Sequence, residues 1–200
     1  MLVGLTGGIA SGKSTAAKQL SQEANIQVIY TDELAKLLMR TDAVRQQIKA
    51  ICGDDVYNAN GDVNTQLLQL RFHTHPGLRE QVEAVVHPRV WESIRDTYKG
   101  LDHDMILVVE SAIIYDIGWQ DRFDQMVVVH CSFAEQRRRC AEERNMPGHV
   151  IASMMAMQAS LTDRLSMADH IVDSDCPLEL FQDRVADLSL ALQQAKEGAL

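Results

Sequence analysis

The sequence predicts an α/β fold in which helices flank a central parallel sheet in three layers. Short apolar runs alternate with segments of helical periodicity along the chain, which is the order expected for a parallel sheet with helical crossovers. The chain also opens with an apolar strand, a glycine-rich turn and an Ala/Leu-rich helix. Backbone N–H groups at such a helix start form an anion-binding site, so the same segment predicts phosphate binding.

The apolar runs predict five strands. They are expected at Leu2–Thr6, Asn25–Tyr30, Met105–Val109, Gln125–His130 and His170–Asp173. The run Met105–Val109 is the most apolar, which is typical of a central strand covered on both faces. Helices are expected from the glycine turn to about Ala24, over Glu33–Met39 and over Pro177–Gln194, where apolar side chains recur every three or four residues.

The glycine-rich turn follows the pattern G-x-x-x-x-G-K-[ST] from Gly7 to Ser14. Glycines let the backbone of this P-loop wrap tightly, so that several N–H groups can point at one phosphate chain. In this pattern Lys13 reaches the β- and γ-phosphates, and the hydroxyl of Ser14 ligates Mg²⁺. The sequence therefore predicts a P-loop NTPase-type protein that acts on a nucleoside triphosphate.

Composition limits the classes of partner. The chain has 200 residues, 46% of them hydrophobic, and a formal net charge of −9, which suits one soluble domain without the basic stripe that binds nucleic acid. The four cysteines contain no C-x-x-C pair, so neither zinc nor a disulfide framework is expected. No leader precedes the first strand and no apolar run approaches the roughly 20 residues that span a bilayer. We expect a cytoplasmic monomer or weak homo-oligomer with no membrane or nucleic-acid partner.

The chain is expected to form a single kinase-like domain over residues 1–200 with three parts. The core comprises about 1–40, 101–143 and 166–200. Residues 41–100 form a mainly helical insertion that receives the second substrate, and residues 144–165 form a small lid that contains Met146, Pro147 and Gly148. A lid suits phosphoryl transfer because closure excludes water from the reacting groups.

Several polar residues lie where sites form in open parallel sheets, after the carboxyl ends of strands. Asp32 follows the second strand and can orient or deprotonate an attacking hydroxyl, although Asp is also a common helix N-cap. Glu110 and Asp116 follow the central strand and can touch substrate or metal, or can equally be solvated loop acids. His87-Pro88-Arg89 is expected at the start of a helix, where Arg89 can clamp a phosphate and His87 can cap or pack.

Arginines cluster just before the predicted lid, at Arg137, Arg138, Arg139 and Arg144. Phosphoryl transfer requires cations against the charge of the transferring group, and an arginine that arrives on lid closure supplies one. We expect at least one of the four to act in this way. Taken singly, each arginine is by default expected to be a solvated surface side chain.

These motifs together resemble the dephospho-coenzyme A kinase family. The resemblance rests on Leu5–Thr15, the Asp32-x-x-Ala35-Lys36 segment, Gly53 and Gly61, His87-Pro88, Glu110–Asp116, Arg144, Gln158 and Ala168–Asp173. It implies ATP-dependent phosphorylation of the ribose 3′-hydroxyl of dephospho-CoA, with ATP and Mg²⁺ as cofactors.

The same resemblance implies roles for individual residues. Gly8 and Ala10, Ser11, Gly12, Lys13, Ser14 and Thr15 would cradle the ATP phosphates, with Ser14 on the metal. Thr6 and Asp32 would lie at the acceptor hydroxyl, with Asp32 as the base. Arg144 would be the lid arginine. Substrate would be held by Asp32, His87, Arg89 and Asp116.

The chain departs from the family pattern at four positions, Tyr30, Thr65, Asp116 and Ser174, where the family often has Asp, Arg, Glu and Asn. Family members usually space two arginines four residues apart before the lid, whereas Arg144 lies four residues after Cys140, so a one-residue shift is needed to pair it with Arg139. Two alternatives remain open at this stage. One is another small-molecule or nucleotide kinase of the same fold, and the other is a catalytically weak nucleotide-binding regulator, which Tyr30 favours.

Overall fold

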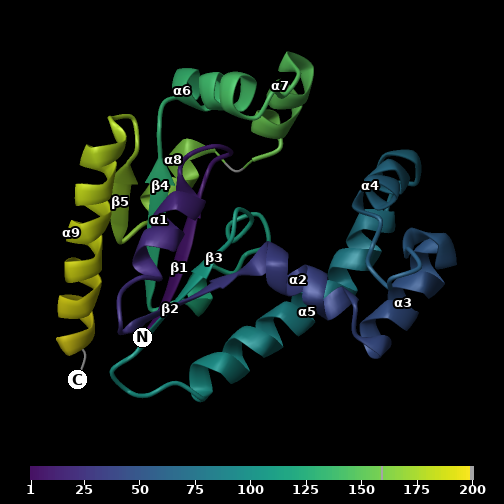
Figure 1. The fold of residues 1–200 in the computed structure, drawn as a ribbon, viewed down its shortest axis with the longest axis horizontal. Helices are drawn as coiled ribbons and strands as arrows, with labels where there is room; N and C mark the ends of the chain where they lie inside the picture. The colour runs from purple at the N-terminus through teal and green to yellow at the C-terminus, as the bar shows by residue number, and fades with distance from the viewer. Residues whose placement is uncertain (159, 199–200) are drawn as a thin grey trace. The chain divides into compact units, whose positions relative to one another are not determined.

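A five-stranded sheet organises the computed structural model, which describes residues 1–158 and 160–198. The strands are β1 (Leu2–Gly7), β2 (Ile26–Tyr30), β3 (Ile106–Glu110), β4 (Gln125–His130) and β5 (His170–Asp173). Their order across the sheet is β2-β3-β1-β4-β5 (Figure 1). β1 is parallel to β3 and β4, and β4 is parallel to β5, so the predicted α/β class with a parallel sheet is confirmed.

The central strands β1 and β3 are buried along their whole length. Every residue of β1 and β3 is buried, as expected for strands covered on both faces. The one glycine in the middle of β1, Gly4, permits this packing, because a Cβ there would come within 2.6 Å of the Met126 Sδ on β4. The predicted strands at 125–130 and 170–173 are confirmed at both ends.

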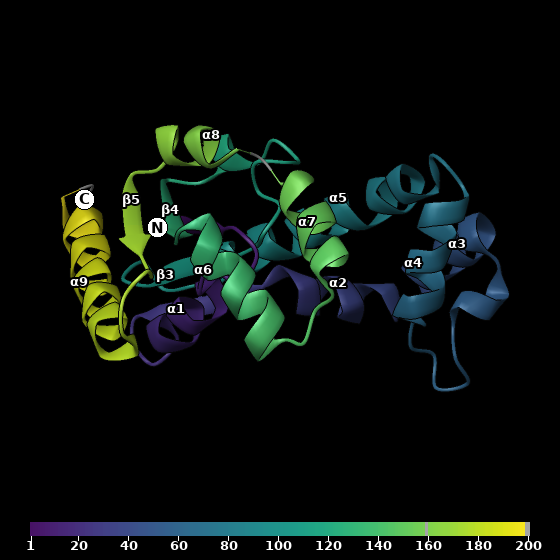
Figure 2. The same ribbon diagram turned by 90° about the horizontal axis from the view of Figure 1, so that it is seen from above.

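Helices flank the sheet. α1 (Lys13–Leu20) packs on β1 and β3, and α9 (Leu178–Glu197) packs on α1 and runs along β5 (Figure 1). The buried face of α9 carries Phe181, Val185, Leu188 and Leu192, at the helical spacing expected from the sequence. After β4 the chain forms α6 (Phe133–Arg138), a π-helical turn η3 (Arg139–Glu143), α7 (Gly148–Ala156) and α8 (Leu161–Ser166), with α7 packed against η3 (Figure 2).

The chain divides into two compact units. The first comprises Met1–Ile29 with Asp102–Leu200, and the second comprises Tyr30–Leu101. The second unit contains α2 (Thr31–Met39), α3 (Asp42–Cys52), η1 (Asp54–Val56), α4 (Thr65–Thr74) and α5 (Leu78–Lys99). Within it α5 packs on α2, α3 and α4, and the Tyr57 hydroxyl donates a hydrogen bond to the Met39 carbonyl at 2.9 Å.

Two helix boundaries predicted from the sequence are wrong. α1 ends at Leu20 rather than near Ala24, because the chain turns through i→i+3 bonds from Gln22 to Gln19 and from Glu23 to Leu20. The expectation that His87-Pro88-Arg89 begins a helix also fails, since Pro88 lies inside α5, which starts ten residues earlier, after Gly77. The buried residues Val82, Val86, Val90 and Ile94 repeat every four positions on both sides of the proline. Their burial outweighs the cost of a proline in the helix interior.

No helix of the described residues combines the length and the hydropathy that a membrane crossing requires.

Candidate nucleotide-binding site

The glycine loop joins β1 to α1 and is shaped by close backbone approaches. Gly12, the N-cap of α1, has φ 94°, a left-handed conformation that favours glycine. A Cβ on Gly7 would lie 2.1 Å from the Val129 carbonyl oxygen, so only glycine fits there. The Ser11 amide donates to the Gly8 carbonyl at 3.2 Å, which closes the turn. The loop therefore holds the fixed backbone arrangement that the sequence motif predicts.

The groups that would meet a phosphate chain lie around the start of α1. No side chain caps this helix and its first turn holds no acid, so neither competes with an anion there. The Lys13 ammonium donates to the Gly8 carbonyl at 3.2 Å, and Ser14 and Thr15 are exposed in the first turn. This donor set fits a triphosphate.

Two buried hydroxyls near the loop lack hydrogen-bond partners among the described residues. They are Oγ1 of Thr6, at the end of β1, and Oγ of Ser11. Unpaired buried hydroxyls are costly and mark places where a ligand can supply the missing bond. Residues 1–158 and 160–198 contain no group of three or more His, Cys, Asp or Glu side chains that could hold a metal ion.

The loop also has an apolar side. Ile9 and Ala10 pack with Cys140 of η3 and Ile151 of α7 in one buried cluster, against which Met146 and Met155 rest. Ala10 has φ 54°, which is unusual for a residue with a Cβ. Ile151, Met146 and Met155, which belong to the predicted lid, therefore pack in or against the same apolar cluster as the loop residues Ile9 and Ala10.

Arg139 ties the loop to the segment after β5. Its guanidinium donates to the Ala10 carbonyl at 3.2 Å, to the Ser174 hydroxyl at 3.1 Å and to the Ser174 carbonyl at 2.6 Å. The Ser174 hydroxyl in turn donates to the Ser11 carbonyl at 2.6 Å. The family departure Ser174 is therefore a buried link between the loop and Arg139.

The neighbouring arginines have different surroundings. Arg138 and Arg139 both hydrogen-bond Glu135, which lowers the pKa of that carboxyl to about 2. Arg144, the predicted lid arginine, is exposed at the end of η3, followed by Asn145 with φ 50°. Within the part of the chain that the structure describes, Arg139 hydrogen-bonds the loop and Arg144 does not.

A further arginine, Arg164 of α8, is 3% exposed although it carries a charge. Its Nη1 lies 3.5 Å from Gln158 Oε1, and its Nε is buried without a hydrogen-bond partner among the described residues. Burial lowers the pKa of Arg164, while the nearby Asp116 carboxylate and Tyr115 raise it. The predicted substrate residue Asp116 is thus exposed but lies near this buried cation.

The remaining predicted site residues belong to the second unit. Asp32 is exposed in the first turn of α2, two residues beyond the end of β2. His87 is half-buried in α5, and burial lowers its pKa. Arg89 is exposed on the same helix and pairs with Glu92 at 3.4 Å.

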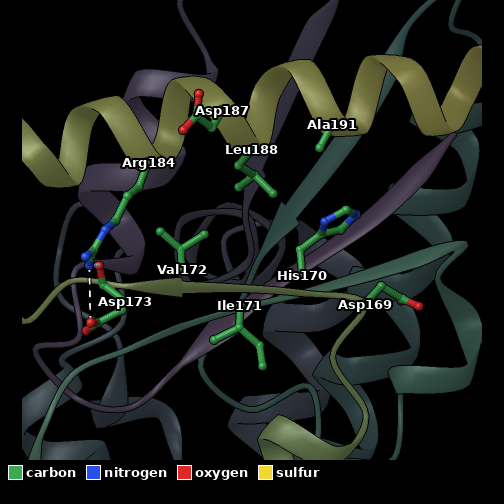
Figure 3. A pocket seen from close by; sticks show the side chains of 9 residues that line it. All are labelled: Asp169, His170, Ile171, Val172, Asp173, Arg184, Asp187, Leu188 and Ala191. Carbon is green, nitrogen blue, oxygen red and sulfur yellow. Dashed lines mark hydrogen bonds and ion pairs between the residues drawn. The ribbon is translucent and has the colours of Figure 1, made fainter.

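A pocket at the edge of the sheet is lined by residues of β5 and α9 and by Asp169. In Figure 3 Val172 and Leu188 point toward each other between the strand and the helix, whereas Ile171 points to the other side of the strand. Arg184 closes one end of the pocket through its ion pair with Asp173 at 3.2 Å. None of its lining residues belongs to the glycine loop, so the pocket does not contribute to the nucleotide site.

A parallel sheet in this order, with a phosphate-binding loop after its middle strand β1, defines the P-loop kinase fold. Comparison with known proteins gives the family. The family model described as dephospho-CoA kinase matches residues 1–179. A dephospho-CoA kinase of Aromatoleum aromaticum is 34% identical over 175 residues, which is 86% of this chain and 84% of the relative. The chain belongs to the dephospho-CoA kinase family, whose members are ATP-using kinases.

Solved structures share the fold. A Thermus thermophilus protein superposes with a TM-score of 0.81 at 22% identity and covers 96% of both chains. A dephospho-CoA kinase from Campylobacter jejuni gives a TM-score of 0.64 at 15% identity and covers 94% of both chains.

Sequence reasoning missed two functional candidates, the Arg139–Ser174 link and the Gln158–Arg164 pair. Arg139 and Ser174 lie 35 positions apart in the chain. Gln158 and Arg164 lie only six positions apart, but Gln158 contacts the loop through Ile9, which is 149 positions away. The only signals available were an arginine cluster and a glutamine within a family motif, and neither indicates a partner.

Proposed function

We propose that the chain transfers the γ-phosphate of ATP to the ribose 3′-hydroxyl of dephospho-CoA, giving coenzyme A and ADP. The observation that carries the proposal is the match of the dephospho-CoA kinase family model to residues 1–179, a span that includes the glycine loop. The loop supports it chemically, since its backbone amides, Lys13 and the start of α1 match a triphosphate.

In the proposed reaction the 3′-oxygen attacks the γ-phosphorus, and the bond from phosphorus to the β,γ-bridging oxygen breaks. Lys13 neutralises charge on the β- and γ-phosphates. Asp32 accepts the proton of the attacking hydroxyl, a role supported by its place directly after β2, since sites in such sheets lie beyond the carboxyl ends of strands. Thr6 contributes its buried hydroxyl at the acceptor side.

Mg²⁺ is the proposed metal, and when bound it would neutralise charge on the β- and γ-phosphates. Ser14 is the residue that would hold it, because its exposed hydroxyl lies in the first turn of α1. Residues 144–165 are the proposed lid, with Arg144 reaching the transferring phosphate on closure and residues 41–100 receiving the acceptor. His87, Arg89 and Asp116 are proposed to contact that acceptor.

We further propose that the protein works in the cytoplasm as a monomer or weak homo-oligomer. Its four cysteines are free, and three of them are buried, which suits a reducing compartment. Sedimentation at several concentrations measures the oligomeric state.

The test of function is ADP release with ATP, Mg²⁺ and dephospho-CoA, compared with AMP and adenosine as acceptors. Release that depends on dephospho-CoA, with a product of the mass of coenzyme A, is the expected result. Release with AMP or adenosine instead would assign another kinase of the same fold. ATP binding without transfer to any acceptor would favour a regulator.

A further inference from the structure

We propose that Gln158 and Arg164 form a γ-phosphate sensor, in which Gln158 holds a loop amide until the terminal phosphate takes it and Arg164 then binds that phosphate. The inference rests on the proposed use of ATP. It assigns a role in the reaction to Gln158, a residue of the family pattern, and to Arg164.

The first observation is the hydrogen bond at the loop. The amide of Ile9 donates to Gln158 Oε1 at 3.2 Å. Gln158 also borders the preceding residue, because a Cβ on Gly8 would lie 3.2 Å from the same oxygen. A side chain from the predicted lid region therefore accepts from an amide of the very loop whose amides bind phosphate.

The second observation identifies which phosphate belongs at this amide. Lys13 Nζ lies 3.2 Å from the Gly8 carbonyl, so the ammonium lies beside the Gly8–Ile9 peptide. Backbone amides of this loop cradle phosphates, and the lysine of the motif reaches the β- and γ-phosphates. Because the Ile9 amide belongs to the peptide that the lysine contacts, we assign this amide to the terminal phosphate.

The third observation is the state of Arg164. The guanidinium is buried, its Nη1 lies 3.5 Å from Gln158 Oε1, and its Nε has no hydrogen-bond partner among the described residues. The Asp116 carboxylate lies near this guanidinium, but the Nε donor has no hydrogen-bond partner among the described residues, and an anionic ligand can supply one. Planar guanidinium donors match phosphate oxygens in two-point contacts.

The backbone around Arg164 is held in place, which makes the side chain a suitable fixed cation. The Tyr115 hydroxyl donates to the Arg164 carbonyl at 3.1 Å, and Ser160 caps the start of α8 by accepting from the Asp163 amide. Gln158 is half-buried, and we assign it as the partner that phosphate displaces. The Ile9 amide then has an acceptor in both states, which is Gln158 Oε1 without ATP and a phosphate oxygen with ATP.

The test compares a non-hydrolysable ATP analogue with ADP by calorimetry, at fixed Mg²⁺ and without acceptor. Arg164→Ala should weaken the analogue by about tenfold to a hundredfold, the range of one charge-assisted bond, and change ADP affinity by less than about twofold. The matched control is Arg122→Ala, which removes an arginine that stacks on Trp119 away from the loop and should leave both affinities unchanged.

A second variant covers the case in which Arg164→Ala does not fold. Gln158→Glu places a carboxylate on the Ile9 amide, where it pairs with Arg164 and repels phosphate. It should weaken the analogue about tenfold and spare ADP, whereas Gln158→Ala should bind the analogue no more weakly than the unmodified chain. Equal losses for analogue and ADP, unchanged affinities in folded variants, or an effect only on dephospho-CoA binding would each overturn the proposal.

Failure of the proposed function would look different. If the unmodified chain shows the Arg164-dependent preference for the triphosphate but transfers no phosphate to dephospho-CoA, the acceptor assignment is wrong and the sensor stands. Transfer to dephospho-CoA that is insensitive to Arg164 would support the proposed function and overturn the sensor. In an active enzyme Arg164→Ala should also lower kcat by about a hundredfold or more, because it removes a donor to the transferring group.

Discussion

The Ser174 hydroxyl is the smallest group whose removal tests the link between the glycine loop and Arg139. Ser174→Ala deletes the donor to the Ser11 carbonyl at 2.6 Å and the acceptor of the Arg139 guanidinium at 3.1 Å. Ser174 is 2% exposed, so water cannot readily replace the lost bonds. The substitution changes the size of the side chain very little, which isolates the hydrogen bonds.

The expected size of the effect follows from these bonds. A buried polar group left without a partner costs about 1–3 kcal/mol, and the Ser11 carbonyl bears most of this cost. Arg139 still donates to the Ala10 carbonyl and to the Ser174 carbonyl, so its loss is small. We expect the free energy of unfolding to fall by about 2 kcal/mol. For a chain of this length that lowers Tm by about 4–8 °C.

Thermal and urea unfolding followed by circular dichroism measure this change, and the KM for ATP should rise in the same variant because the loop backbone loses its anchor. The matched control is Ser21→Ala, which removes an exposed hydroxyl that donates to the Lys18 carbonyl at 2.7 Å. It should change stability by less than about 0.5 kcal/mol. Equal stability of the two variants, with no change in KM for ATP, would refute the argument.

The remaining predictions concern catalysis, the loop backbone and pH. Lys13→Ala and Asp32→Asn should each lower kcat about a hundredfold or more in the ADP-release assay with Tm unchanged, and normal turnover in Asp32→Asn would show that the base is another group. Gly7→Ala should lower the free energy of unfolding by about 2–3 kcal/mol in urea, because its Cβ would meet a β4 carbonyl oxygen at 2.1 Å, whereas Gly148→Ala meets no atom within 4 Å and should be nearly neutral. Burial lowers the pKa of His87 below its ordinary 6.5, so the unfolded chain binds more protons and stability is lost as pH falls below about 6.5. His87→Gln should flatten this part of a urea-unfolding pH series, and an unchanged slope would contradict the assignment.

Local patterns predict the parts of the fold that depend on local chemistry. The run Gln125–His130 is a strand in the structure because its central residues are all apolar and are covered on both faces. The glycine loop is predictable because its backbone demands specific residues at fixed offsets. Pro88 misleads the prediction, since a proline predicts a helix start unless tertiary burial carries the helix across it, and the buried side of α5 does so.

The candidate site is predicted less completely for the same physical reason. A sequence motif shows which residues bind phosphate, but it does not show which distant side chains hydrogen-bond the loop that carries the motif. Gln158 and Ile9 are neighbours only because the chain returns to the loop after β4, and no local periodicity encodes that contact. The arginine cluster is predictable as a group, whereas the choice among its members depends on how the helix that carries them turns.

The π-helical turn η3 determines which arginine of the cluster contacts the glycine loop. In an α-helix residues four apart share a face, and a regular turn would place Arg144 on the face of Cys140, which is buried against Ile9. A π turn uses i→i+5 spacing and so accommodates one extra residue. Because η3 spans Arg139–Glu143, Cys140 stays in the apolar cluster, Arg139 keeps its bonds to Ala10 and Ser174, and Arg144 emerges exposed at the first residue of the predicted lid. The one-residue shift between the arginines is therefore absorbed by the backbone, which gives Arg139 a positioning role in the loop and leaves Arg144 to be tested as the lid arginine.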